Sequence, residues 1–291
     1  MVNLKDGLIT KLIGGLYTVR DEENNSFKIK ARGKFRHNNE SPKVGDRVRF
    51  DDDFIMEVKE RRNNLHRPAV CNVDQAILIN SAKEPDFSFN LLDRFILLVE
   101  HEDITPVIII TKIDLMPPEE LVVIKEKMKY YEQYYDVYYV SNKTLEGTKD
   151  VYDIFKDKIT VFAGQTGAGK SSLLNALDPS LNLATNEISK ALGRGKHTTR
   201  HSELLDVFGG LIADTPGFSK LEFVDVLEEE VPDCFVDFFK LSSSCKFRGC
   251  THINEPKCNV KDQLALGNIL PSRYKNYQII LEEIKGQKKK Y

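Results

Sequence analysis

Short apolar runs separated by turn residues fill the first 68 residues of the chain. They occupy residues 7–19, 26–35, 44–50 and 54–60. Brief strands at this spacing are typical of a small β-barrel or sandwich. Residues 1–68 are therefore expected to form one such domain.

The pattern changes after the polar, basic link at residues 61–70, which contains Pro68 and reads as a domain boundary. Continuous apolar runs of strand length now alternate with stretches of helical period. Parallel strands joined by helical crossovers form an α/β sandwich, which is expected over residues 69–220. Strands are expected at 73–80, 106–114, 136–141 and 159–164, and helices at 90–101, 117–134 and 147–158.

A third pattern follows the polar stretch at 182–201. Residues 203–217 read as two strands, and the dipeptide Gly209-Gly210 is a hairpin-turn signal between them. From about residue 221 the pattern is helical, interrupted by a group of cysteines. The third domain is therefore expected to be a small helical one over residues 221–291.

Basic residues occupy alternate positions in the segment 27–36. In a strand they share one face, opposite Phe27, Ile29 and Phe35. A stripe of one charge sign, without an acid inside it, is the footprint of a protein that contacts a phosphate backbone; a solvated outer face is the alternative. The candidate RNA-binding residues are Lys28, Lys30, Arg32, Lys34 and Arg36.

The segment 164-GQTGAGKS-171 fits the phosphate-binding pattern G-x-x-x-x-G-K-[ST] between an expected strand and an expected helix. Its backbone N–H groups would point at phosphate oxygens, Lys170 would contact the β and γ phosphates, and Ser171 would ligate Mg²⁺. The expected nucleotide-binding residues here are Gly164, Gln165, Thr166, Gly167, Ala168, Gly169, Lys170, Ser171 and Ser172.

The segment 111-TKID-114 ends an expected strand and reads as a guanine-selective loop. Asp114 would accept hydrogen bonds from N1 and N2 of guanine, donors that adenine lacks, and Lys112 would lie along the base plane. Thr111 stands where Asn is more usual, but its hydroxyl can still tie the loop to the phosphate loop. Ser141 and Asn142, before Lys143, occupy the place of a second base loop, usually Ser-Ala-Lys; a surface loop is the alternative.

The segment 214-DTPG-217 follows the phosphate loop by about forty residues and ends a strand. Asp214 and Gly217 are therefore expected to hold Mg²⁺ through water and to sense the γ-phosphate. In the basic segment 193–201, Thr198 and Thr199 both qualify as the switch threonine on Mg²⁺, with Thr199 preferred.

Phe218 stands where many GTPases place the Gln that orients the attacking water. Unaided hydrolysis is therefore expected to be slow. His197 is the nearest polar candidate for the role; a solvated switch-loop residue or an RNA contact is the alternative.

Four metal-ligating side chains lie close together near the C-terminus: Cys245, Cys250, His252 and Cys258. A full set of four soft or borderline ligands suits one structural, tetrahedral Zn²⁺. Cys71 and Cys234 stand apart and are expected to be packed thiols.

The composition indicates an ordinary soluble protein, but it does not predict a binding partner. The apolar fraction of 41%, the charged fraction of 30% and the net charge of −2 are ordinary for a soluble protein. No apolar run approaches the roughly 20 residues of a membrane span, and no secretory signal begins the chain, so a cytoplasmic location is expected.

The base loop precedes the phosphate loop, which is a circular permutation of the usual GTPase order. A sheet depends on which strands are neighbours, so moving the termini preserves the site. The chain then leaves the GTPase domain just after 214–217. Nucleotide state is therefore expected to bias the position of the C-terminal region.

With this motif order, an N-terminal barrel and the cysteine cluster, the whole chain resembles the RsgA family, the ribosome small-subunit-dependent GTPases of bacteria. The resemblance implies an OB-fold barrel, GTP hydrolysis with Mg²⁺ stimulated by the 30S subunit, binding to 16S rRNA and a role in late 30S maturation. It also implies that an apolar residue at Phe218 is normal and that His197 replaces the missing Gln. A monomer is expected.

Two alternatives remain open. In one, the protein is a GTP-gated rRNA-binding module whose occupancy, rather than turnover, carries the function. The other, an ATP-dependent kinase, is disfavoured by Asp114.

Overall fold

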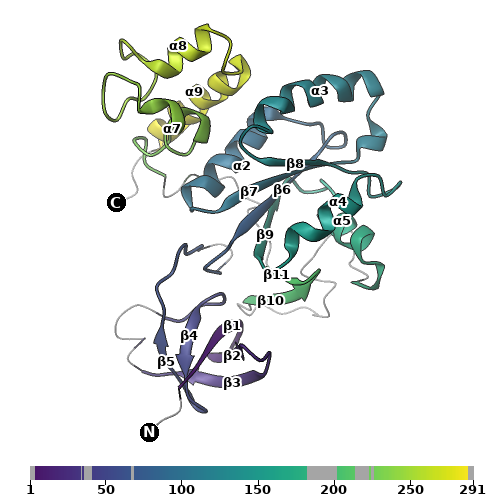
Figure 1. Ribbon diagram of the computed structural model, residues 1–291, viewed down its shortest axis with the longest axis vertical. Coiled ribbons are helices and arrows are strands. Elements are labelled where there is room, and N and C mark those ends of the chain that lie inside the picture. Colours follow the sequence, from purple (N-terminus) through teal and green to yellow (C-terminus); the bar gives the residue numbers. More distant parts are fainter. Residues whose placement is uncertain are drawn as a thin grey trace. The chain divides into compact units, whose positions relative to one another are not determined.

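The computed structural model describes residues 4–33, 35, 41–66, 69–181, 202–213, 223 and 226–287 (Figure 1). The chain divides into two compact units. Unit 1 contains residues 1–76, 148–162 and 170–218, and unit 2 contains residues 77–147, 163–169 and 219–291. Each unit therefore draws on segments that are far apart in the sequence.

Unit 1 begins with a closed five-stranded barrel, as the N-terminal pattern predicts. Its strands are β1 (Lys5–Ile13), β2 (Leu16–Asp21), β3 (Ser26–Ala31), β4 (Arg47–Phe50) and β5 (Phe54–Val58). The order is β2-β3-β5-β4-β1, and a further pairing of β2 with β1 closes the ring. Alternate residues point inward and are almost fully buried: Ile9, Val19, Ile29, Val48, Phe50 and Ile55.

Two details of the barrel differ from the sequence-based expectation. The apolar run 7–19 is two strands, because Gly14 and Gly15 both take positive φ and form a tight hairpin turn. The strand expected through residue 36 ends at Ala31, so Arg32 lies after its end. Lys34 and Arg36 lie outside the described residues.

The barrel joins the rest of unit 1 through β1. The first half of β1 pairs with β4, and Lys11 and Leu12 pair with β10 (Ser202–Val207). Antiparallel β11 (Gly210–Ala213) and then parallel β9 (Ile159–Gly164) continue the sheet. The unit also contains the short helices α4 (Thr148–Tyr152) and α5 (Lys170–Leu177) and the 3-10 turns Asp153–Phe155 and Pro179–Leu181.

The turn between β10 and β11 is Phe208-Gly209, one residue earlier than expected. Both residues take positive φ. Gly210 instead starts β11, where a Cβ would lie 1.8 Å from the carbonyl oxygen of Phe155. Gly210 is therefore required by the close approach of another backbone and not by the turn.

Unit 2 contains the neighbouring strands β6 (Gln75–Ser81, whose first two residues belong to unit 1), β7 (Thr105–Thr111) and β8 (Asp136–Tyr139). Helices α2 (Phe89–His101) and α3 (Pro118–Tyr131) and the 3-10 turn Ile113–Leu115 connect them. All seven residues of β6 are buried, as in parallel sheets covered on both faces. The expected α/β pattern is confirmed.

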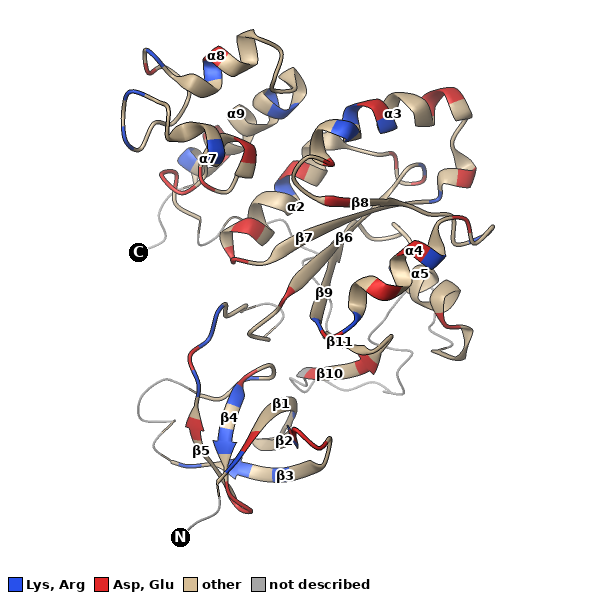
Figure 2. Ribbon diagram, viewed as in Figure 1, with Lys and Arg blue, Asp and Glu red and all other residues tan. Residues whose placement is uncertain are grey.

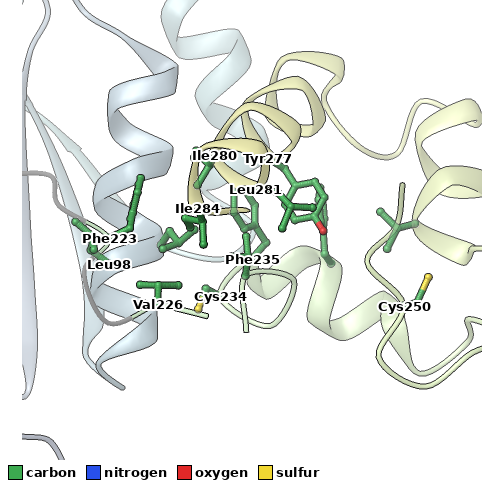
Figure 3. Packing of buried hydrophobic residues seen from close by; sticks show 14 of the residues in the cluster. Leu98, Phe223, Val226, Cys234, Phe235, Cys250, Tyr277, Ile280, Leu281 and Ile284 are labelled. Carbon is green, nitrogen blue, oxygen red and sulfur yellow. The ribbon is translucent and has the colours of Figure 1, made fainter. Parts of the chain in front are cut away.

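The C-terminal part of unit 2 contains α7 (Val236–Ser242), α8 (Asn259–Ala265) and α9 (Pro271–Gly286). These helices do not form a separate core. Leu97 and Leu98 of α2 belong to the same buried cluster as residues of the C-terminal region (Figure 3). That cluster includes Phe223, Val226, Phe235, Phe238, Tyr277, Ile280, Leu281 and Ile284.

A buried ion network reinforces this junction. The guanidinium of Arg273 in α9, 1% exposed, donates to Asp93 of α2 at 2.5 Å and to Asp237 of α7 at 3.0 Å. Tyr131 of α3 donates to Asp93 at 2.8 Å, and Tyr130 donates to Asp237 at 2.7 Å. Helices α2, α3, α7 and α9 are therefore linked through one set of buried polar groups.

The two carboxylates respond differently to the same cation. Burial raises the pKa of Asp93, although Arg273 opposes the shift. Burial also acts on Asp237, but there the charge and hydrogen bonds of Arg273 outweigh it, and its pKa is lowered. Asp237 is thus the carboxylate that the network most strongly keeps ionised.

Candidate functional site

The phosphate loop lies between a strand and a helix, as its motif requires. β9 ends at Gly164, and α5 begins at Lys170. Gly164 has φ +139°, and a Cβ there would lie 2.2 Å from the carbonyl oxygen of Ile79. Only glycine fits at the start of the loop, because the backbone of β6 passes directly against it.

Lys170 and Ser171 occupy the first turn of α5, at the N-terminal end where helix N–H groups attract anions. Ser171 is buried. Burial lowers the pKa of the Lys170 ammonium. A phosphate group beside Lys170 would favour its charged form. An anionic ligand would therefore compensate for the cost of burying the ammonium.

The base loop is tied to the phosphate loop by the hydroxyl expected to do so. Thr111, the last residue of β7, donates from Oγ1 to the carbonyl oxygen of Ala168 at 2.5 Å. Lys112 takes a left-handed conformation with φ 57°, and its Nζ donates to the carbonyl oxygen of Glu84. The two loops, about fifty residues apart in the sequence, are therefore in direct contact.

Asp114 is held by the second base loop. The Oγ of Ser141, a buried residue, donates to Asp114 Oδ1 at 2.6 Å. The same Oγ accepts from the backbone N–H of Thr144 at 3.1 Å. Ser141 therefore fixes the direction of the exposed carboxylate that was expected to select guanine.

Asn142 connects the second base loop to the phosphate loop. Its Nδ2 donates to the carbonyl oxygen of Gly169 at 3.3 Å. Its Oδ1 is buried and has no hydrogen-bond partner among the described residues. This hydrogen bond ties the second base loop to the phosphate loop. The alternative interpretation of the sequence was a surface loop without such a contact.

Several expected site residues lie outside the described residues. They are His197, Thr198, Thr199, Asp214, Gly217 and Phe218. β11 ends at Ala213, so 214–217 follows a strand directly, as expected.

The four expected metal ligands come together in unit 2. One ligand atom from each of Cys245, Cys250, His252 and Cys258 lies within 4.8 Å of all the others. His252 Nδ1 is 3.3 Å from Cys258 Sγ and 3.8 Å from Cys245 Sγ, and the two sulfurs are 4.0 Å apart. Tetrahedral zinc with bonds near 2.3 Å separates its sulfur ligands by about 3.8 Å, so the group can hold a metal ion.

The sequence did not identify the side chains that hold the metal loop in shape. Glu255 accepts hydrogen bonds from the backbone N–H groups of Thr251 at 2.7 Å and Ile253 at 3.0 Å. Tyr274 in α9 donates to the carbonyl oxygen of His252 at 2.6 Å.

The two isolated thiols, Cys71 and Cys234, are buried as expected.

Basic residues of the barrel lie on strands β3 and β4 (Figure 2). Lys28, Lys30 and Arg32 are exposed, and so are Arg47 and Arg49 of β4. The last two were missed, although the alternation in 47-RVRF-50 gives the same signal over a shorter run. Arg47 and Arg49 are thus further candidates for RNA contact, although Arg49 also pairs with Glu57 of β5 at 3.7 Å.

A hollow of about 720 Å³ in unit 1 is lined by cationic and carboxylate side chains in equal number, so it is unsuited to selecting an ion of one sign. These side chains are Arg20, Arg47, Arg62, Lys158, Glu60, Asp74, Asp157 and Asp206.

Among helices in the described ranges, none is long and apolar enough to cross a bilayer.

Two family models match the chain. The RsgA GTPase model matches residues 58–224, and the RsgA N-terminal domain model matches residues 6–54. A Bacillus subtilis (strain 168) protein named small ribosomal subunit biogenesis GTPase RsgA is 50% identical, covering 99% of this chain and 100% of its own. A protein of the same name from Shouchella clausii (strain KSM-K16) is 47% identical with the same coverage.

Two solved structures are similar over nearly the whole chain. One, described as YloQ, a circularly permuted GTPase, has a TM-score of 0.85 and 44% identity, covering 99% of this chain and 98% of its own. The other, YjeQ from Thermotoga maritima, has a TM-score of 0.86 and 36% identity, covering 98% of this chain and 100% of its own.

Proposed function

The chain belongs to the RsgA GTPase family and is a circularly permuted GTP hydrolase, and from this we propose that it binds the 30S ribosomal subunit and acts in its late maturation. In this role it hydrolyses GTP to GDP and phosphate, and the 30S particle stimulates the reaction. The observation that carries the proposal is the contact of Thr111 with Ala168, which brings the base loop against the phosphate loop in permuted order. Full-length similarity to proteins named small ribosomal subunit biogenesis GTPase supports the choice of particle.

The described residues of the site are assigned roles that fit their positions, and the other roles are assigned from the sequence motifs. Asp114, oriented by Ser141, accepts from the guanine edge, and Lys112 lies along the base. Residues 164–169 surround the phosphates with backbone N–H groups, and Lys170 contacts the β and γ phosphates. Magnesium with GTP neutralises phosphate charge; Ser171 and Thr199 would hold it, and Asp214 and Gly217 would complete the γ-phosphate side.

His197 is proposed to position the attacking water, because Phe218 cannot. The role is to hold the water rather than to bind nucleotide, so His197→Ala should cut 30S-stimulated hydrolysis while leaving GTP affinity near normal. Full stimulated activity in that variant would remove His197 from the mechanism.

The decisive experiment is GTP hydrolysis titrated with purified 30S subunits, with 50S subunits as the control. We expect strong stimulation by 30S alone, absent from Lys170→Ala. Asp114→Asn should shift the preference from guanine toward xanthine nucleotides, because an amide reverses the hydrogen-bonding pattern at the base edge. If the protein binds 30S subunits in a GTP-dependent way but the subunits do not increase its rate of GTP hydrolysis, the alternative is supported instead. In that alternative, occupancy rather than turnover carries the function.

Cys245, Cys250, His252 and Cys258 are proposed to hold one structural zinc ion. Three sulfurs and one imidazole suit zinc, and four protein ligands leave no open position for catalysis. Metal analysis of the purified protein should give one zinc per chain. A stoichiometry near zero in protein purified without chelator would contradict the assignment.

The barrel is proposed to contact 16S rRNA through Lys28, Lys30, Arg32, Lys34 and Arg36, together with Arg47 and Arg49. We propose residues 1–68, 69–220 and 221–291 as the RNA-binding, GTPase and metal-binding divisions of a cytoplasmic monomer. Replacing the basic residues by Gln should flatten the salt dependence of RNA binding. An unchanged salt slope would favour a solvated face.

A further inference from the structure

Two consecutive carbonyl oxygens of the phosphate loop are held by side chains from two different base loops. Thr111 donates to Ala168, at 2.5 Å, and Asn142 donates to Gly169, at 3.3 Å. Gly169 takes φ +95°, and a Cβ built on it would lie 3.3 Å from Asn142 Nδ2 and 3.6 Å from Thr111 Oγ1. Both tethers therefore meet at the last turn of the loop, immediately before Lys170.

The chemistry of these side chains explains why two are needed. A threonine hydroxyl has one hydrogen to donate, whereas an asparagine amide has two. With Thr at position 111, where Asn is more usual, the base loop can hold the carbonyl of Ala168 but has no second donor for Gly169. Asn142, where Ala is more usual, supplies that donor from the other loop.

We infer that Asn142 is a positioning residue of the nucleotide site and that its amide compensates for the missing donor at Thr111. The inference rests on the proposed guanine-nucleotide site and adds a coupling between two departures from the common motifs. The amide fixes the carbonyl of Gly169, and thereby the peptide that leads into Lys170. A loose peptide there would let the lysine and the neighbouring N–H groups drift from the phosphates.

The carbonyl oxygen of the Asn142 side chain supports the same role. Asn142 Oδ1 is buried without a hydrogen-bond partner in the described part of the chain. Buried acceptors are nearly always satisfied in folded proteins, so an exception needs an explanation. In the nucleotide complex, a donor from the nucleotide or from water that it orders would satisfy this oxygen.

The test compares the wild type with Asn142→Ala, Thr111→Asn and the double variant, using a fluorescent GDP analogue. Asn142→Ala should weaken binding about tenfold, the value of one buried hydrogen bond. The double variant should recover to within about threefold of wild type, because Asn at 111 has two donors. Thr111→Asn alone should gain nothing, since the carbonyl of Gly169 is already held.

Two further variants keep the result interpretable. Asn142→Asp retains size and the acceptor but loses the donor and directs a carboxylate at a carbonyl oxygen, so it should bind more weakly than Asn142→Ala. Leu145→Ala, in the same loop with a side chain 55% exposed, should bind as wild type does. Melting temperatures should fall little in the free proteins, and the nucleotide-induced rise should shrink in the Asn142 variants.

Wild-type affinity in Asn142→Ala, or a double variant no tighter than Asn142→Ala, would overturn the inference. So would a lower melting temperature of free Asn142→Ala with an unchanged nucleotide-induced rise, which marks a purely structural side chain. If the wild type itself binds no guanine nucleotide, the proposed function fails as well, and the two failures are thereby distinguished.

Discussion

The barrel and the C-terminal helices are attached within their units by different kinds of junction. The barrel in unit 1 meets β10 through two paired residues of β1, Lys11 and Leu12. Two ion pairs accompany this ladder: Lys11 with Glu203 at 2.7 Å, and Arg20 with Asp206 at 2.5 Å, the latter carboxylate mostly exposed. The C-terminal helices of unit 2 instead share a hydrophobic cluster with α2, and the polar network around the fully buried Arg273 links them to α2 and α3.

The contrast shows at which junction a charged side chain contributes more to stability. Ion pairs that remain partly exposed, as these two do, contribute at most about 1 kcal/mol each and weaken with salt, whereas removing one partner of a fully buried pair costs about 3–5 kcal/mol. The C-terminal helices are therefore fixed to α2 and α3. If nucleotide state biases the position of the C-terminal region, as the sequence led us to expect, α2 and α3 must move with it.

The largest predicted effect is at Arg273. Arg273→Met leaves Asp93 and Asp237 buried without their cation, and we expect a loss of about 3–5 kcal/mol in the free energy of unfolding. Urea denaturation followed by circular dichroism measures it. Arg94→Met is the matched control, because Arg94 also joins α2 to α9, through Glu283, but that carboxylate is 40% exposed.

The control should lose no more than about 1 kcal/mol. Adding Asp93→Asn and Asp237→Asn to Arg273→Met should recover part of the loss, because neutral amides cost less to bury than uncompensated carboxylates. Equal losses in the two arginine variants would contradict the distinction between buried and partly exposed ion pairs.

Metal loss should have an intermediate effect. Cys250→Ser or a chelator removes the link among residues 245–258, and we expect destabilisation on the order of 2 kcal/mol, because bound metal contributes directly to folding. Hydrogen exchange should rise in that loop. Cys234→Ser, a buried cysteine outside the cluster, should keep both its metal content and its sensitivity to chelator.

The smallest effect should be at the barrel junction. Lys11→Ala with Arg20→Ala removes both ion pairs but leaves the β1–β10 ladder, so a loss of at most about 1–2 kcal/mol is expected, and it should be smaller in high salt. Denaturation at low and high ionic strength measures it. A large, salt-independent loss would mean that this junction is as rigid as the one at Arg273.

The sequence predicted best where the chemistry is local. The phosphate loop, the base loop and the four metal ligands are each contained within fourteen residues or fewer, and the fold class and family are confirmed. Arg273 could not be predicted, because its partners Asp93 and Asp237 are 180 and 36 residues away and each looks like an ordinary polar helix residue. Asn142 was identified as a partial motif match, but its bond to Gly169 required the fold.

Strand β1 belongs to three ladders, because it pairs with β2, with β4 along its first half and with β10 near its end. A strand shared in this way cannot rotate in one sheet without twisting the other. A rotation of the barrel would therefore be passed to β10 through the hydrogen bonds of the β1–β10 ladder.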